Sequence, residues 1–158
     1  MVPGIMTEQR WIFVIKIHRQ PGVLNAVTGV FTNWGIGLQT AMLNERGTEG
    51  ADGIVILSFQ SSPRKKAILE RTVSRLSRVT DIKSYPYETN DLRMIAACTV
   101  DINYQYEKTD NVEIEELNTT ADRKLLYVSG TVKEVDHYIS PMLEKKELLD
   151  LVKTILTT

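Results

Sequence analysis

Residues 11–36, WIFVIKIHRQPGVLNAVTGVFTNWGI, decide the fold. They open with an apolar run rich in β-branched and aromatic residues, which predicts a buried strand over 11–17. The Pro21-Gly22 pair marks a turn. The apolar residues that follow recur at helical spacing and predict an amphipathic helix, which ends at Gly35 because glycine accepts the left-handed conformation common after a helix. These apolar residues are Val23, Val27, Val30, Phe31 and Trp34.

Two strands are predicted after this helix. Alternation of apolar and polar residues indicates the first over 36–43, and the run IVILSF indicates the second over 54–59. The intervening segment 44–53 is polar and contains three glycines, Gly47, Gly50 and Gly53, so it is interpreted as a loop. Antiparallel pairing of the two strands across this loop follows.

A second helix and a final strand complete the first unit. Ser62 and Pro63 are typical of an N-cap and of the first helical position, and an apolar stripe runs on from Ile68. Residues 81–87 predict the last strand. The order strand, helix, strand, strand, helix, strand is ferredoxin-like βαββαβ, an antiparallel sheet with two helices on one face, over residues 10–88.

The second half, residues 90–158, has a weaker pattern. It predicts a smaller, reduced α+β unit, with a polar, non-helical stretch at 103–110. A short helix follows Gly130 and is expected to break near Pro141. Residues 148–156 leave helix and strand both open. The strands expected here are 92–102, 112–117 and 125–129.

Composition excludes several classes of function. The chain has 158 residues, 42% of them hydrophobic and 25% charged, as in an ordinary globular protein. Its formal net charge of −1 argues against nucleic acid as a partner. No apolar run approaches the ~20 residues of a membrane span, and no signal peptide is evident, so a cytoplasmic protein is expected. The basic residues Arg64, Lys65, Lys66, Arg71, Arg75 and Arg78 are interpreted as the solvated face of the second helix.

Candidate catalytic and metal-binding residues are few. Cys98 is the one cysteine and lies in an apolar run, which favours a buried, inert thiol. The two histidines, His18 and His137, are not its sequence neighbours. No metal site, cofactor motif or catalytic signature is predicted. The acidic residues Asp110, Glu113, Glu115 and Glu116 are interpreted as a solvated loop or edge strand.

The Pro21-Gly22 turn has the physical features of a ligand site. Gly22 lets a ligand approach the backbone closely, and it stands where free N–H groups and the helix dipole favour a carboxylate. A free amino acid offers such a carboxylate. The alternative interpretation is that Pro21-Gly22 only makes a tight connection between strand and helix.

Residues 20–31 (QPGVLNAVTGVF), followed by Trp34-Gly35-Ile36, resemble the signature of the ACT domain. Within that family the similarity is to the small regulatory subunit of acetohydroxyacid synthase, also called acetolactate synthase, an enzyme of branched-chain amino-acid biosynthesis. Gly29-Val30-Phe31 and the segments 68–79 and 93–100 add to the resemblance.

The resemblance implies a non-catalytic protein that binds a small amino acid, commonly valine, at the interface of a homodimer or higher homo-oligomer. It also implies a catalytic subunit of acetolactate synthase as partner, contacted by the C-terminal unit. Ligand contacts carried over to the loop are Arg19, Gln20, Pro21, Gly22, Val23 and Leu24. Those carried over to the start of the second strand are Gly35, Ile36, Gly37, Leu38 and Gln39.

The chain departs from the family at two contact positions. Gly37 stands where the family has an asparagine, and the usual asparagine of the loop is also absent, with Arg19 near that place. A site that loses one polar partner for its ligand loses roughly 1–3 kcal/mol of binding free energy, so the resemblance does not identify valine as the ligand. Two alternatives stay open. One is a free-standing ACT-domain metabolite sensor with another protein partner, and the other is a small enzyme on a ferredoxin-like scaffold.

Overall fold

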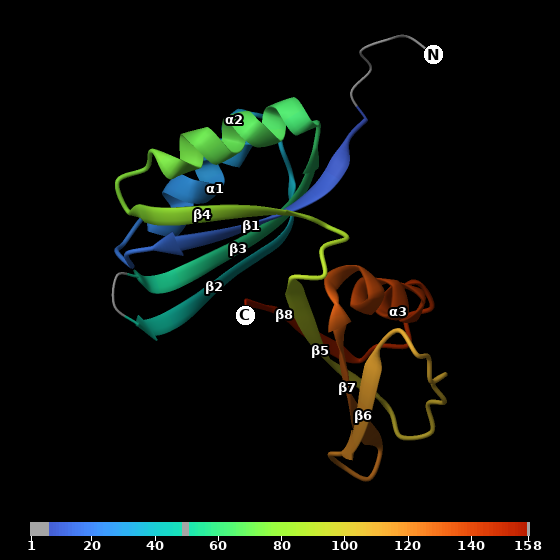
Figure 1. The fold of residues 1–158 in the computed structure, drawn as a ribbon. Coiled ribbons are helices and arrows are strands. Elements are labelled where there is room, and N and C mark those ends of the chain that lie inside the picture. The colour runs from blue at the N-terminus through green and yellow to red at the C-terminus, as the bar shows by residue number, and fades with distance from the viewer. Residues whose placement is uncertain (1–6, 49–50, 158) are drawn as a thin grey trace. The chain divides into compact units, whose positions relative to one another are not determined.

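The computed structural model describes residues 7–48 and 51–157. The chain divides into two compact units, the first ending at Tyr87 and the second beginning at Glu88. Each unit is a four-stranded antiparallel sheet with helices against it (Figure 1). The α+β class predicted from the sequence is therefore confirmed.

The first unit has the predicted element order. The sheet runs β2-β3-β1-β4 with antiparallel neighbours throughout. Both helices lie on the same face of it (Figure 1). The βαββαβ prediction is confirmed: after each helix the chain enters an edge strand, β2 after α1 and β4 after α2, while β1 and β3 form the centre of the sheet. The elements are β1 (Gln9–Ile17), α1 (Val23–Asn33), β2 (Leu38–Thr48), β3 (Ala51–Ser61), α2 (Pro63–Ser74) and β4 (Val79–Pro86).

Three phenylalanines form the centre of the core between the sheet and its helices. Phe13 of β1, Phe31 of α1 and Phe59 of β3 are fully buried. Their ring centroids lie 4.8 to 5.9 Å apart in edge-to-face contacts, which add about 0.5–1.5 kcal/mol per pair beyond the burial of apolar area. This cluster fixes α1 on the two central strands.

The prediction of a polar loop over 44–53 is wrong for those of its residues that the structure describes. Strand β2 continues to Thr48 and β3 already begins at Ala51, with Asn44 opposite Ile54 and Glu45 opposite Gly53. Strand β2 is at the edge of the sheet, where polar side chains reach water without interrupting the backbone ladder, so polarity did not mark a loop. Gly50 lies outside the described residues.

Helix α2 begins as predicted. Ser62 is the N-cap, its Oγ accepts a hydrogen bond from the Lys65 amide at 3.2 Å, and Pro63 is the first helical residue. Leu69 and Val73 are buried under the helix. Of the basic residues assigned to its outer face, all but Lys66 are exposed; the Lys66 ammonium lies 4.8 Å from the centre of the Trp11 ring.

The second unit is not the reduced one expected from the sequence. Its sheet runs β6-β7-β5-β8, so its strands follow the same spatial order as those of the first unit. The two units differ between their first two strands, where the first unit has α1 and the second has an irregular connection over 102–112. Its elements are β5 (Leu92–Asp101), β6 (Glu113–Asn118), β7 (Arg123–Thr131), α3 (Val132–Glu144) and β8 (Asp150–Thr157).

Two further expectations in this unit are settled. The helix break expected near Pro141 is wrong, because α3 continues through that residue to Glu144. Proline removes the bond that its own N–H would donate and crowds the carbonyl four residues earlier. Here only one turn follows it, Met142 is buried, and the Lys145 amide still bonds the Pro141 carbonyl at 3.0 Å. The ambiguous segment near the end is strand β8, which pairs with β5.

Replacing Phe31 by alanine should destabilise the first unit by about 3–5 kcal/mol, because the change leaves a cavity inside the phenylalanine cluster. Phe31→Leu should cost less, and exposed Thr32→Ala should stay within about 0.5 kcal/mol of the parent. Both tryptophans, Trp11 and Trp34, belong to the first unit, so their fluorescence during urea unfolding reports on it. Equal midpoints for Phe31→Ala and Thr32→Ala would contradict the role of the cluster.

Candidate functional site

The connection between β1 and α1 borders a cavity of about 420 Å³. All six loop residues implied by the resemblance line it, from Arg19 to Leu24. Ile17, Asn25 and Leu43 complete the lining. Leu43 was not among the predicted contacts. The only signal for it was a leucine on an edge strand, which the structure leaves 44% exposed.

Gly22 is the N-cap of α1 and has a φ of +88°. Side chains other than glycine rarely adopt this conformation, so the turn itself requires glycine. Because glycine offers no side chain, the first turn of α1 has no side-chain cap, and no acidic residue lies in that turn. Helices α2 and α3 differ, since Ser62 and Thr131 cap them through their hydroxyl groups. The start of α1 therefore presents amide N–H groups and the positive end of the helix dipole at the cavity.

Arg19 is held against strands β2 and β3 by three contacts. Its amide donates to Asp52 Oδ1 at 2.7 Å, and its guanidinium pairs with Glu45. Its aliphatic stem covers Gly53, where an added Cβ would come within 2.8 Å of Arg19 Cγ. The hydrogen bond from the Arg19 amide is the main cause that lowers the pKa of Asp52. These contacts fix Arg19 at the start of the loop, and the same residue lines the cavity.

The second predicted set lies at the other end of α1. Gly35, with a φ of +67°, ends the helix as predicted, and Ile36 is buried with its amide bonded to the Phe31 carbonyl at 2.9 Å. Gly37 is exposed, and Leu38 begins β2. None of these residues lines the cavity. The eleven-residue helix separates the two sets by about 16 Å, so one chain does not bring them together.

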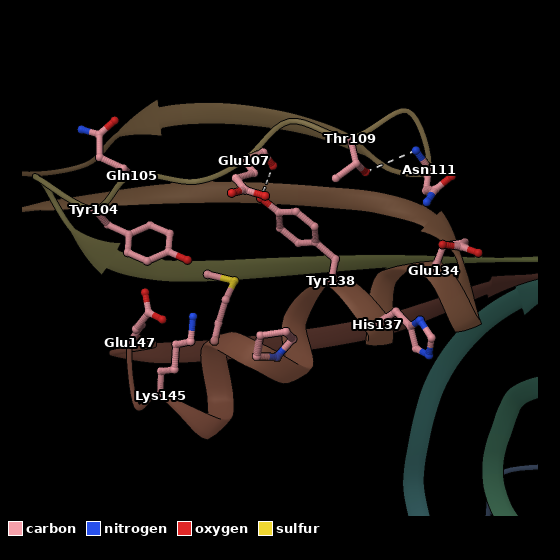
Figure 2. Close-up of a pocket in the computed structure, with 12 residues that line it drawn as sticks. Tyr104, Gln105, Glu107, Thr109, Asn111, Glu134, His137, Tyr138, Lys145 and Glu147 are labelled. Atoms are coloured by element: carbon pink, nitrogen blue, oxygen red, sulfur yellow. Dashed lines mark hydrogen bonds between the residues drawn. The ribbon is translucent and has the colours of Figure 1, made fainter.

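The second unit has a cavity of its own, of about 430 Å³, which the sequence did not indicate. It lies between the connection 102–112 and α3, and Figure 2 shows side chains entering it from both. Tyr138 of α3 reaches across and donates from its hydroxyl to the Glu107 carbonyl at 3.0 Å. The residues that form it come from an irregular segment and a helix, so no regular spacing marks them in the sequence.

The sequence predictions also cover Cys98 and the possible metal ligands in the parts of the chain that the structure describes. Cys98 is fully buried, as predicted, and burial raises the pKa of its thiol to about 11. Within the described ranges, no group of three or more His, Cys, Asp or Glu side chains is placed to hold a metal ion. None of the described helices is long and apolar enough to cross a membrane.

An antiparallel sheet in the order β2-β3-β1-β4 beneath two helices, with a Pro-Gly turn before the first helix, is a ferredoxin-like βαββαβ unit. Over nearly the whole chain, the fold is that of the small subunit of acetolactate synthase from Thermotoga maritima. The TM-score is 0.69 at 17% identity, over 95% of this chain and 96% of that one.

Two further solved structures give lower TM-scores. The regulatory subunit of aspartate kinase from Thermus thermophilus gives a TM-score of 0.44 at 13% identity, over 88% of this chain and 97% of that one. The ACT domain of GTP pyrophosphokinase from Chlorobium tepidum gives a TM-score of 0.42 at 18% identity, over 51% of this chain and 89% of that one. No protein-family model matches the sequence, and no curated protein matches it.

Two glycines of the same region should respond to alanine in opposite directions. Gly22→Ala should destabilise the first unit by about 1–2 kcal/mol, because alanine is strained at positive φ. Gly29→Ala should stabilise it by roughly 0.5–1 kcal/mol, because Gly29 is inside α1 and alanine is the better helix former. An added Cβ meets nothing within 4 Å at either position. Urea unfolding followed by tryptophan fluorescence measures both, and a shared sign would contradict the assigned conformations.

Cys98 should react slowly with iodoacetamide in the native protein. Its pKa is raised from 9.0 to about 11, which lowers the thiolate fraction at pH 8 about a hundredfold, and burial slows the reaction further. The comparison is the alkylation rate of the native and the urea-unfolded chain, followed by mass spectrometry. A native rate within tenfold of the unfolded rate would show that the thiol is accessible.

Proposed function

We propose that this protein is a non-catalytic regulator that binds a small amino acid at the β1–α1 turn and acts on a catalytic subunit of acetolactate synthase in the cytoplasm. The observation that carries the proposal is the start of α1, which has no side-chain cap and borders a cavity of about 420 Å³ at Gly22. The similarity of fold to an acetolactate synthase small subunit supports the choice of partner.

The carboxylate of the amino acid is the group best suited to the start of α1. Uncapped amide N–H groups and the helix dipole together favour an anion there. Arg19 adds a positive charge at the rim, shared with Glu45. The apolar side chain of a small amino acid would then contact Val23, Leu24 and Leu43, which line the same cavity.

A second copy of the chain is required if the proposed contacts at Gly37 and Leu38 are to be used. Within one chain these residues lie about 16 Å from Gly22, across the length of α1. A twofold axis places the start of one α1 near the end of its partner, because such an interface uses the same surface in opposite directions on both subunits. Ligand binding and dimer formation would then be linked, and each would strengthen the other.

A thermal-shift screen of the purified protein against the twenty amino acids tests the ligand. A ligand that binds only the folded state stabilises it by about 2.7 kcal/mol at a hundredfold excess over Kd. We expect a selective shift with a branched-chain amino acid, lost in Gly22→Asp because a carboxylate at the N-cap repels the ligand. Gly29→Ala, inside the same helix, is the matched control and should keep the shift.

Gly37→Asn restores the asparagine of the resembled family and tests the second contact. Gly37 has open space around it and does not have a positive φ, so asparagine fits without strain. This variant should bind the selected amino acid about tenfold more tightly, as expected for one added hydrogen bond to a charged group. An unchanged Kd would show that Gly37 lies outside the site.

Mixing the protein with an acetolactate synthase catalytic subunit tests the partner. A regulatory subunit should change the rate of acetolactate formation and make that rate sensitive to the amino acid. A selective thermal shift without any effect on the synthase would instead favour the free-standing sensor. No shift with any amino acid would reject amino-acid binding at this turn.

A further inference from the structure

The cavity of the second unit, which we call the second cavity, exists because the chain forms no helix after β5. In the first unit α1 follows the first strand, whereas here residues 102–112 are irregular and α3 is the one helix described in the unit. The cavity lies between this connection and α3. This cavity and the one at the β1–α1 turn are therefore each bordered by the segment that follows the first strand of a four-stranded sheet.

The connection is fixed by hydrogen bonds on both sides. The Tyr106 hydroxyl donates to Glu116 Oε2 of β6 at 3.0 Å, and the Tyr138 hydroxyl of α3 donates to the Glu107 carbonyl at 3.0 Å. The Lys124 ammonium lies 5.4 Å from the centre of the Tyr106 ring and adds a cation–π contact. The two walls of the cavity are thus fixed relative to each other before any ligand binds, which lowers the conformational-entropy cost of binding.

The lining combines an apolar surface with carboxylates. Figure 2 shows the ring of Tyr104 from the connection and the ring of Tyr138 from α3, with Glu107 and Glu147 on either side of the Tyr104 hydroxyl. Met142, which also lines the cavity, is buried beneath. Burial, followed by the charge and hydrogen bond of Glu147, raises the pKa of Tyr104. Both tyrosines thus remain neutral hydroxyls in a field made negative by carboxylates.

The residue that follows α3 contributes one positive charge to the cavity. Lys145, immediately after α3, lines the same cavity as Glu147. Opposite charges at one end of a cavity suit a ligand that itself carries an ammonium group, with or without a carboxylate.

We propose that the second cavity binds a primary ammonium group attached to an apolar body, the chemistry shared by amino acids and simple alkyl amines. The ammonium lies between the carboxylates of Glu107 and Glu147. The apolar body lies against Tyr104, Tyr138 and Met142, where ring faces also attract a cation. An amino acid places its carboxylate on Lys145. This proposal stands independently of amino-acid binding at the β1–α1 turn.

Methionine methyl groups provide a readout specific to this cavity. The chain has five methionines, so a spectrum of isotope-labelled methyl groups is simple to assign. Met142 lines the cavity, whereas Met94 is buried in β5 and does not. Titration with leucine, isoamylamine and 4-methylpentanoate compares the amino acid, the amine and the acid on nearly the same carbon skeleton. We expect the first two to shift the Met142 signal and leave Met94 in place, and the acid to have no effect.

Two substitutions assign the charged contacts. Glu147→Gln should weaken binding of both ammonium ligands about tenfold, because it removes a charge-assisted contact and keeps the shape of the side chain. Glu144→Gln, exposed on α3 outside the cavity, is the matched control and should leave Kd unchanged. Lys145→Gln should weaken binding of leucine alone, because isoamylamine has no carboxylate for this ammonium group to contact.

Three results would overturn the proposal. The first is the absence of a Met142 shift with leucine or isoamylamine at about 10 mM, which is ten times a weak Kd of about 1 mM. The second is an equal shift with 4-methylpentanoate. The third is an unchanged Kd in Glu147→Gln. An unmoved Met94 signal in each variant shows that the unit is still folded. Gly22→Asp should leave the Met142 titration unchanged, so failure of the first site is distinguished from failure of the second.

Discussion

Each of the two sheets in this protein has an apolar face that must be shielded from water. The structure of each unit and the position of its cavity depend on which segment covers that face. In the first unit α1 and α2 cover the face, with Phe31 packed against the rings of Phe13 and Phe59. In the second unit α3 packs on β5 and β7, and an irregular connection takes the place of the missing helix. Where helix α1 covers the sheet, the cavity lies at the start of that helix. Where the irregular connection takes its place, the cavity lies along the neighbouring helix α3. The two cavities follow from this difference.

The two sites also differ in the groups that they offer. At the β1–α1 turn recognition would rest on backbone amides, because a φ of +88° at Gly22 excludes a capping side chain. In the second cavity it would rest on side chains, among them Tyr104 and Glu147. Backbone recognition depends on one conformation and tolerates little change at a single glycine. Side-chain recognition is spread over several residues, each of which can be replaced without altering the fold.

The sequence predicted the first unit well because its signals are local. Helical spacing, Gly35 and the Ser62-Pro63 pair each depend on a few neighbouring residues, and each was confirmed. It failed where an edge strand carries polar side chains, since Asn44 and Glu45 look like loop residues until their pairing with β3 is known. It also failed at Pro141, where the buried Met142 keeps α3 helical. The second cavity could not be foreseen, because its walls meet only through tertiary contacts.

The pairing pattern of the strands has a consequence for the order in which the protein can be completed during synthesis. Strand β4 (Val79–Pro86) pairs with β1, so the first sheet is complete once the chain has been made as far as residue 86. In the second sheet, β5 lies between β7 and β8 and lacks one neighbour until Asp150–Thr157 has left the ribosome. Domains generally fold as units as the chain emerges. The first unit can therefore be folded while the apolar side chains of β5 still await their last partner, so late in synthesis the second unit is the one still open to chaperones and proteases.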